Sequence, residues 1–171
     1  MTTIRPATPD DALGVAAAHV RSWQVGYRGL LPDDLLDGLD VEQRASRYDF
    51  TSRLPGHYTL VADDDGVICG HVTVAEGTLG EGASDQSPRG EVFGFYVDPP
   101  RWGTGLGRLL MSAGRAELVA AGHRDAVLWM LEGNARAQRF YERDGWVLDG
   151  GRRADYANPG VHDVRFRRTL P

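Results

Sequence analysis

The residues of this chain best suited to chemistry form a glycine-rich run, DPPRWGTGLGR, between Asp98 and Arg108. The run follows an apolar segment, EVFGFYV (residues 91–97), and precedes leucines and alanines at helical spacing. A glycine-rich turn between a strand and the start of a helix lets backbone N–H groups close around an anion, and the helix dipole adds to the attraction. The run therefore predicts a phosphate-binding site.

The spacing of this run excludes two common phosphate-binding motifs. The Walker A pattern requires a lysine after its last glycine, and the sequence contains no lysine. The dinucleotide pattern requires Gly-x-Gly-x-x-Gly, whereas Gly103, Gly105 and Gly107 are spaced Gly-x-Gly-x-Gly. Arg101 and Arg108 flank the loop and either pair with phosphate oxygens or lie as solvated charges. The absence of lysine therefore disfavours an enzyme that uses nucleoside triphosphates.

The elements that must position this loop alternate between strands and helices. Strands are expected at residues 3–6, 57–63, 67–75, 91–97, 126–132, 146–149 and 161–170, the second and third as a hairpin around an Asp-Gly turn. Helices are expected from Pro9 to before Gly29, from Pro32, over 40–50, from Thr104 to Ala121 and from Asn134 to Arg143. Loops are expected at 77–90 and 150–160. This order predicts an α+β fold with a mixed sheet.

The bulk composition bounds the class of protein. A chain of 171 residues, 42% of them hydrophobic, is expected to form one domain over residues 1–171. A net charge of −5 argues against nucleic acid as a partner. The first residues lack the layout of a signal peptide and no apolar run is long enough for a membrane, which predicts a cytoplasmic protein without membrane contact. Cys69 is the only cysteine and is expected to be a buried thiol.

Two segments, in order along the chain, resemble the GNAT superfamily of N-acetyltransferases. EVFGFYVDPPRWGTGLGRLL resembles the acyl-CoA-binding segment, whose usual pattern is (Gln/Arg)-x-x-Gly-x-(Gly/Ala), and the segment from Asn134 to Trp146, N-x-x-A-x-x-F-Y-E-x-x-G-W, resembles the second. The firm match covers residues 91–146, and the rest of the chain fits in layout only. Trp102 departs from the pattern because it stands where the family has Gln or Arg. The resemblance implies a twisted, mostly antiparallel sheet of six to seven strands with a splayed strand pair, flanked by about four helices.

The resemblance implies acetyl-CoA as co-substrate and no metal. Amides from Trp102 to Gly107 would hold the pyrophosphate, and the pantetheine arm would pair with strand 91–97 where it splays from strand 126–132. Gly94 is the expected bulge site for this splay. Asn134 would contact the pantetheine arm or serve as a helix N-cap. The implied cofactor-binding residues are Phe95, Tyr96, Val97, Arg101, Trp102, Gly103, Thr104, Gly105, Leu106, Gly107, Arg108 and Asn134.

The resemblance also implies a proton acceptor and a proton donor. Glu91 would act through water as general base, because an alkyl ammonium of pKa about 10 cannot attack a thioester until it loses a proton. Tyr141 would protonate the departing thiolate of CoA. On the residues alone, Glu91 can equally be a strand-edge carboxylate and Tyr141 a core ring. The candidates for the acceptor pocket are Trp23, Tyr27, His71 and Trp129.

The function expected is an N-acetyltransferase that moves an acetyl group to a primary amine of a small molecule or peptide by direct transfer in a ternary complex. The alternative is a non-catalytic sensor of the same fold that binds acyl-CoA. The acidic net charge favours cationic acceptors. The last strand is expected to be exposed, so that it could support a homodimer. The five histidines show no spacing with Cys, Asp or Glu that suggests a metal site.

Overall fold

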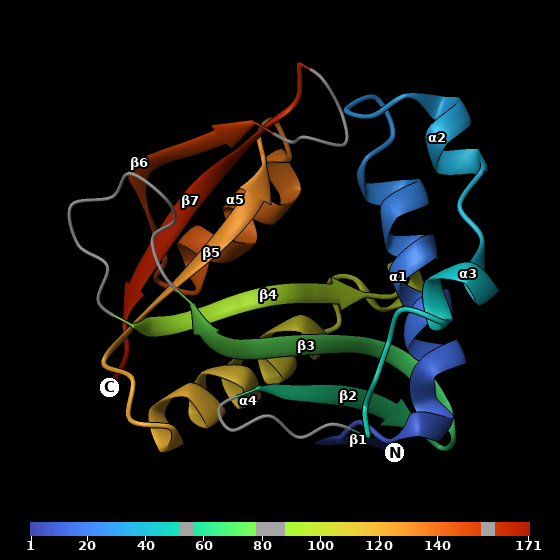
Figure 1. Cartoon of the computed structure of the whole chain (residues 1–171), viewed down its shortest axis with the longest axis horizontal. Helices are drawn as coiled ribbons and strands as arrows, with labels where there is room; N and C mark the ends of the chain where they lie inside the picture. Colours follow the sequence, from blue (N-terminus) through green and yellow to red (C-terminus); the bar gives the residue numbers. More distant parts are fainter. Residues whose placement is uncertain (52–56, 78–87, 155–159) are drawn as a thin grey trace.

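The structure, a computed structural model, describes residues 1–51, 57–77, 88–154 and 160–171. In these residues the chain forms seven strands and five α-helices around one sheet (Figure 1). The order is β1 (Thr2–Pro6), α1 (Ala12–Gly26), α2 (Asp33–Asp37), α3 (Val41–Ala45), β2 (Tyr58–Asp64), β3 (Val67–Gly77), β4 (Arg89–Val97), α4 (Leu106–Ala120), β5 (Asp125–Leu131), α5 (Ala135–Arg143), β6 (Val147–Ala154) and β7 (His162–Thr169). The predicted α+β class and order of elements are confirmed.

The sheet is mixed and opens between its two central strands. Its order is β1-β2-β3-β4-β5-β7-β6, and every pair is antiparallel except β4 and β5. The parallel pairing of β4 with β5 covers only Gly90–Val92 against Ala126–Leu128. Beyond these residues the two strands diverge, as Figure 1 shows. The predicted splay is therefore present, and it leaves one side of β4 without a strand partner.

A β-bulge in β4 changes which side chains share a face of the sheet. Thr73 pairs with Gly94 and Val74 pairs with Val92, so that Phe93 is the extra residue. The bulge was expected at Gly94 and lies one residue earlier. Strict alternation would place Glu91 and Gly94 on opposite faces, whereas the extra residue brings both onto the same face. Tyr96 follows on this face, which we call the acceptor face.

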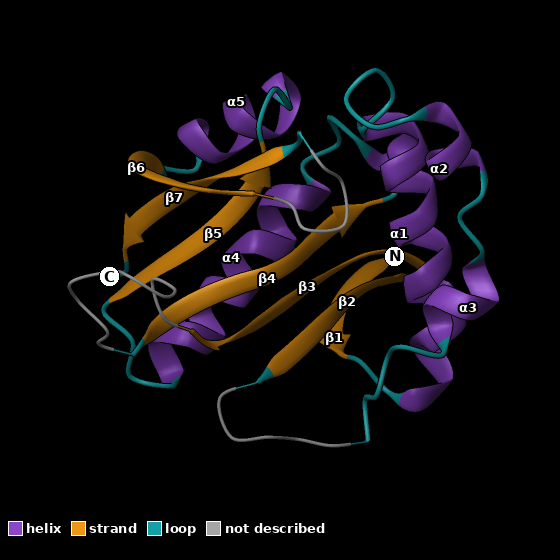
Figure 2. Cartoon of the chain, turned by 45° about the horizontal axis from the view of Figure 1, so that its top comes forward, coloured by secondary structure: helices purple, strands orange, loops and turns teal. Residues whose placement is uncertain are grey.

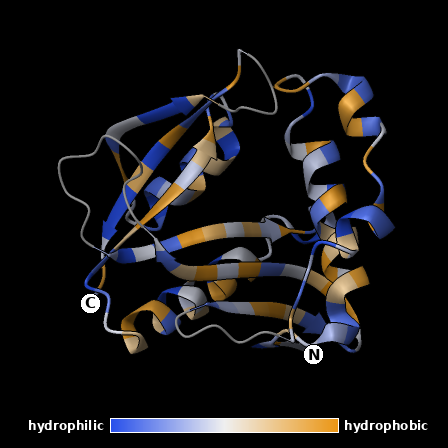
Figure 3. Cartoon of the chain, viewed as in Figure 1, coloured by the Kyte–Doolittle hydropathy of each residue, from blue (hydrophilic) through white to orange (hydrophobic). Residues whose placement is uncertain are grey.

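The two faces of the sheet are covered by different helices. On one face Leu110, Met111 and Leu118 of α4 join a large apolar core with residues of β3, β5 and β7. On the acceptor face Val15 of α1 packs with Val61 and Ile68. Figure 2 shows α4 crossing behind the strands and α1–α3 gathered at one end, and Figure 3 shows apolar residues along β3 and β4. The half of β4 that leads to the glycine loop is thus held between α1 and α4.

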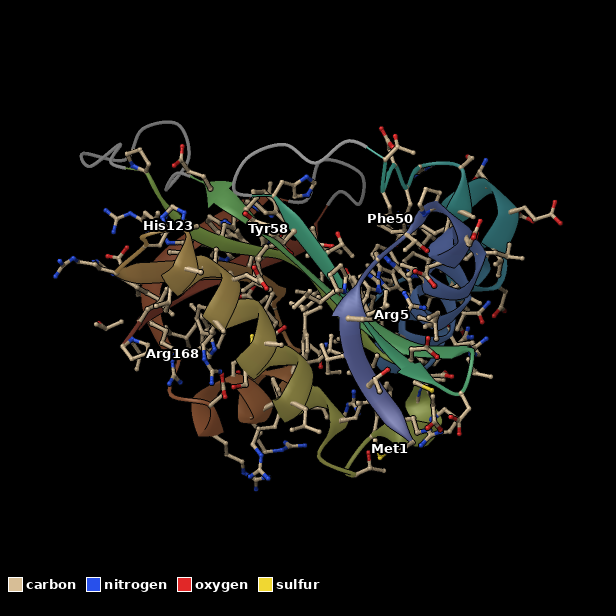
Figure 4. All side chains as sticks on the ribbon, turned by 90° about the horizontal axis from the view of Figure 1, so that it is seen from below. Met1, Arg5, Phe50, Tyr58, His123 and Arg168 are labelled. Carbon is tan, nitrogen blue, oxygen red and sulfur yellow. The ribbon has the colours of Figure 1, made fainter. Side chains whose placement is uncertain are left out.

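The first strand is tied to the helical end of the molecule by ion pairs. The guanidinium of Arg5 pairs with Asp11 at 2.7 Å and with Asp63 at 2.8 Å. The Asp11 carboxylate also accepts from the N–H of Thr8, which completes a capping box ahead of α1. Figure 4 shows β1 with Met1 and Arg5 at this edge of the sheet.

Several predicted boundaries and one predicted exposure are corrected. The helix expected from Thr104 begins at Leu106, the helix expected over 40–50 ends at Ala45, and β6 continues to Ala154 within the expected loop at 150–160. Most of the loop expected at 77–90 (residues 78–87), and residues 155–159, lie outside the described ranges. The last strand, β7, is not exposed at an edge, because it lies between β5 and β6.

Cys69 is buried, as predicted. In the described part of the chain, no helix is long and apolar enough to cross a membrane.

Candidate active site

The glycine loop owes its shape to two residues in the left-handed region. Gly103 has φ 78° and Gly105, the N-cap of α4, has φ 92°. A Cβ atom at either position would meet no atom within 4 Å, so that the need for glycine is conformational rather than steric. Gly107 differs, because its Cβ would lie 3.3 Å from Cε2 of Phe140. Here glycine allows α4 and α5 to approach each other.

The loop presents unpaired N–H groups at the start of α4. The first N–H groups of any α-helix have no partner within the helix. In the described residues, no backbone acceptor takes the N–H groups of Gly103, Gly105, Leu106 and Gly107. Thr104 adds no free donor, because its hydroxyl donates to the carbonyl of Arg101 at 2.8 Å. Together with the helix dipole, the four N–H groups form a site suited to a phosphate.

Several arginines surround this loop, and of the two that were expected to flank it only Arg101 is held in an ion pair in the described part of the chain. Arg101 is engaged in an ion pair with Asp64. Arg108 has no carboxylate partner among the described residues, and neither have Arg136, Arg139 and Arg143 of α5. The sequence reading missed the three arginines of α5, although their spacing of three and four residues places them along one face of a helix. The guanidinium of Arg136 lies 3.0 Å from the centre of the Trp102 ring.

A cavity of about 1030 Å³ extends from this loop into the gap between β4 and β5. Of the residues predicted to bind the cofactor it is lined by Phe95, Tyr96, Val97, Arg101, Trp102, Gly103, Thr104, Gly105, Gly107, Arg108 and Asn134. Tyr141, Tyr27 and Trp129 also line it. The structure does not place Leu106, Glu91, Trp23 or His71 in its wall, and Leu106 is a core residue.

The edge of β4 inside the cavity offers backbone groups. The N–H of Asp98 donates to the carbonyl of Cys69 on β3 at 2.8 Å. Because backbone groups alternate in direction along a strand, Phe95 and Val97 direct theirs into the gap. The carbonyl of Val97 already accepts from Ser22 Oγ at 2.8 Å and from Trp102 Nε1 at 2.6 Å. The N–H groups of Phe95 and Val97 and the carbonyl of Phe95 remain directed at the space of the splay.

Asn134 and Tyr141 stand at the two ends of α5. The side chain of Asn134 accepts from the N–H of Ala137 at 3.1 Å, so that the N-cap reading is correct, and the residue also lines the cavity. Tyr141 is 8% exposed, and its ring centre lies 6.3 Å from that of Phe95 and 5.6 Å from that of Phe166. Burial raises the pKa of Tyr141 well above its usual value. Its hydroxyl therefore keeps its proton and can act as a donor.

Glu91 lies on the acceptor face, just before the bulge. It is 7% exposed, and its side chain covers Gly77, where a Cβ would collide with the carboxylate. Burial raises the pKa of Glu91 to about 7, and the opposing effect of Arg153 and Arg165 is smaller. A carboxylate with this pKa can accept a proton near neutral pH. Although it is not in the cavity wall, it shares a face with Gly94 and Tyr96.

The four candidates for the acceptor pocket are only partly brought together. Tyr27 and Trp129 line the cavity, and the guanidinium of Arg153 lies 4.2 Å from the centre of the Trp129 ring. His71 is 1% exposed and lies behind Tyr96, with 5.4 Å between the ring centres. Trp23 packs against Tyr27 at 5.0 Å. Across the described ranges, no three His, Cys, Asp or Glu side chains come together as a metal site.

These features define a class of protein. A splayed strand pair, a glycine loop at the N-terminus of a helix and a tyrosine in the next helix are those of an acetyl-CoA-dependent transferase. The sequence pattern of the acetyltransferase (GNAT) family matches residues 20–146, more than half of the chain. The chain belongs to this family and is an N-acetyltransferase.

Individual relatives agree with this assignment. An uncharacterized N-acetyltransferase from Bacillus subtilis, YuaI, is 28% identical over 135 residues, which cover 78% of this chain and 74% of that protein. Mycothiol acetyltransferase from Thermobispora bispora is 38% identical over 93 residues, but the match covers 53% of this chain and only 31% of that longer protein.

Solved structures show the same fold. The PaiA N-acetyltransferase from Thermoplasma acidophilum, solved with coenzyme A, gives a TM-score of 0.77 at 15% identity over 99% of both chains. The yncA protein of Salmonella typhimurium, solved with acetyl-CoA, gives 0.68 at 22% identity over 100% of this chain and 95% of that one. Proteins of this fold thus bind CoA and acetyl-CoA.

Proposed function

We propose that the protein transfers the acetyl group of acetyl-CoA to a primary amine of a small molecule or peptide, by direct transfer in a ternary complex. The observation that carries this proposal is the single cavity that joins the glycine loop, the open edge of β4 and the side chains of Tyr27, Tyr141 and Trp129. Donor and acceptor can therefore meet without a covalent enzyme intermediate.

The donor is held at one end of this cavity. The pyrophosphate of CoA binds the N–H groups between Gly103 and Gly107, and Arg108 and the arginines of α5 neutralise its charge. The pantetheine arm takes the place of the missing strand along β4. The N–H of Phe95 or Val97 then donates to the thioester carbonyl and stabilises the negative charge that develops there during attack.

The acceptor amine approaches from the acceptor face of β4, on which Gly94 and Tyr96 lie. Glu91, on the same face, takes a proton from the ammonium group through water. The neutral amine attacks the thioester carbon, its nitrogen releases a second proton to solvent, and the C–S bond breaks as the amide forms. Tyr141 supplies a proton to the departing thiolate, and it regains one from solvent.

Cys69, the one cysteine of the sequence, is not placed to act as a covalent nucleophile. Cys69 lies on β3 away from the cavity wall, and burial raises the pKa of its thiol. A thiol with a raised pKa is a poor nucleophile at neutral pH.

Release of free CoA thiol from acetyl-CoA, followed over a panel of primary amines, tests this proposal. We expect release of the thiol to depend on the amine. We also expect intersecting lines in double-reciprocal plots of initial velocity when the concentrations of both substrates are varied. Parallel lines would contradict direct transfer. Tight binding of acetyl-CoA without release on any amine would favour the sensor instead.

A further inference from the structure

Tyr96, which lines the cavity, belongs to a group of aromatic rings whose other members the proposed mechanism does not use. We call His19, Trp23, Tyr48, His71 and Tyr96 the ring cluster. The ring centre of His19 lies 4.0 Å from that of Tyr96, 5.3 Å from that of Trp23 and 5.8 Å from that of His71. Because Tyr96 also lines the cavity, the ring cluster adjoins the place where the acceptor must enter.

Three buried nitrogen atoms of the ring cluster have no hydrogen-bond partner in the described part of the chain. They are His19 Nε2, Trp23 Nε1 and His71 Nδ1. Burial raises the pKa of Tyr96, and Trp23 lies near enough to the Tyr96 hydroxyl to oppose this rise, although the two groups do not reach ordinary hydrogen-bond geometry. His19 is 6% exposed and His71 1%. Buried polar atoms are rarely left unpaired in folded proteins, and such a group calls for an explanation by a ligand or an ordered water. Three such atoms in one cluster, next to a residue of the cavity wall, would gain hydrogen bonds from a polar group that reached them.

The hydrogen-bonding capacity of two of these atoms favours an acceptor of hydrogen bonds. The indole nitrogen of Trp23 can only donate. His19 Nδ1 lies 2.7 Å from the hydroxyl of Tyr48, and burial raises the pKa of Tyr48 to about 12, so that the hydroxyl keeps its proton. When Tyr48 donates to Nδ1, the neutral His19 ring carries its hydrogen on Nε2. His19 and Trp23, one turn apart on α1, then present two N–H donors.

A guanidinium without a carboxylate completes this set of donors. Arg44 of α3 is half-buried, its Cζ lies 5.6 Å from the centre of the Trp23 ring, and no described carboxylate pairs with it. It also lowers the pKa values of His19 and His71, although burial has the larger effect.

The other charges near the acceptor end are mostly paired. Arg153 pairs with Asp163 at 3.1 Å, and Arg165 pairs with Asp149 at 2.8 Å. Glu91 lies farther along the acceptor face, before the bulge. The local charge around the ring cluster is therefore positive, whereas the whole chain has a net charge of −5.

We propose that the acceptor is an amine that also carries a carboxylate, and that Arg44, with the N–H groups of Trp23 and His19, binds this carboxylate. The inference rests on the proposed amine acetylation and narrows its substrate class. A carboxylate offers two oxygen atoms that accept charge-assisted hydrogen bonds from such donors. An acceptor with a second ammonium group would instead be repelled by the guanidinium of Arg44. It would also find N–H donors where an ammonium needs hydrogen-bond acceptors. Local charge thus opposes the cationic acceptor that the net charge favours.

Matched acceptors test this inference. Thiol release is measured with α- and ω-amino acids and with the carboxamide of each, which keeps the amine and removes the negative charge. We expect kcat/KM to be about 10- to 100-fold higher for the amino acid in at least one pair, the usual range for a hydrogen bond to a charged group. Equal values in every pair would overturn the inference and leave amine acetylation standing. No release with any amine would overturn both.

Substitution of Arg44 tests whether this residue causes the preference for an acceptor with a carboxylate. Arg44→Gln is expected to remove the preference for the amino acid over its carboxamide, mainly by raising KM for the amino acid. The kcat/KM for the carboxamide and the affinity for CoA should stay unchanged. Arg47→Gln, at an exposed arginine three residues later, is the matched control. A loss of kcat/KM that is equal for the amino acid and its carboxamide would contradict the role of Arg44 in binding the carboxylate. A loss of the preference in Arg47→Gln as well would also contradict it. Melting temperatures of the two variants show whether either is misfolded.

Discussion

Glu91→Gln is expected to make the protein more stable and less active at the same time. Burial raises the pKa of Glu91 from 4.5 to about 7 in the folded state. At about 1.4 kcal/mol for each pKa unit, folding with an ionised Glu91 costs about 3 kcal/mol above pH 7. Glutamine has a similar shape and carries no charge, so that the variant avoids this cost.

The dependence on pH has a definite sign. Between pH 4.5 and 7 the folded state keeps the proton that the unfolded state has lost, so that Glu91 makes the stability of the native protein fall as pH rises. Below pH 4.5 Glu91 is neutral in both states and the two proteins should be equally stable. The advantage of Glu91→Gln should therefore grow from pH 4.5 to 7 and then stay constant.

Catalysis should change in the opposite direction. The ionised form of Glu91 accepts the proton, so that kcat/KM of the native protein should rise with pH through an apparent pKa of about 7. The pH profile of Glu91→Gln should lack this rise. Its kcat/KM should be lower by about 10²- to 10⁴-fold, the usual contribution of a general base.

Urea unfolding at several pH values and thiol release from acetyl-CoA give the two readouts. Glu76→Gln, which neutralises an exposed carboxylate on β3, is the control and should change neither by much. A stability difference that does not vary between pH 4.5 and 8 would refute the buried, neutral form of Glu91. An unchanged pH profile of activity would refute its role as base.

The loop and α5 give three further predictions. Gly105→Ala forces a side chain into a left-handed conformation at φ 92° and should cost about 1–2 kcal/mol of stability and weaken binding of CoA, as measured by urea unfolding and calorimetry. Asn134→Ala removes the N-cap bond to Ala137 and should cost about 1 kcal/mol, whereas Asn134→Asp should restore most of it. Tyr141→Phe should lower kcat by about 10- to 100-fold and leave the dissociation constant of CoA unchanged in a calorimetric titration; a loss of CoA affinity would indicate a structural role instead.

The sequence predicted what depends on local pattern. The glycine spacing, the Asp-Gly hairpin and Asn134 as a cap each depend on residues adjacent in the chain, and the structure agrees with all three. The length of β6 and the interior place of β7 could not be predicted in the same way, because strand pairing joins residues far apart in the sequence.

The site was predictable only in part for a similar reason. No pattern distinguishes Phe93 from Gly94 as the extra residue of the bulge, yet this choice decides that Glu91 and Gly94 share a face. The ion pair of Arg101 with Asp64 and the approach of Arg44 to Trp23 also join distant segments. All of the predicted cofactor-binding residues except Leu106 line the cavity, whereas only Tyr27 and Trp129 of the four acceptor-pocket candidates do.

The central claim is that acetyl-CoA occupies the cavity between the glycine loop and the open edge of β4. A titration with acetyl-CoA, followed by amide resonances of the isotopically labelled chain, tests it most directly. The account predicts that the largest shifts occur at the unpaired N–H groups, those of Phe95, Val97, Gly103, Gly105, Leu106 and Gly107. Saturating acetyl-CoA without changes at these amides, or with changes confined to other parts of the chain, would contradict it.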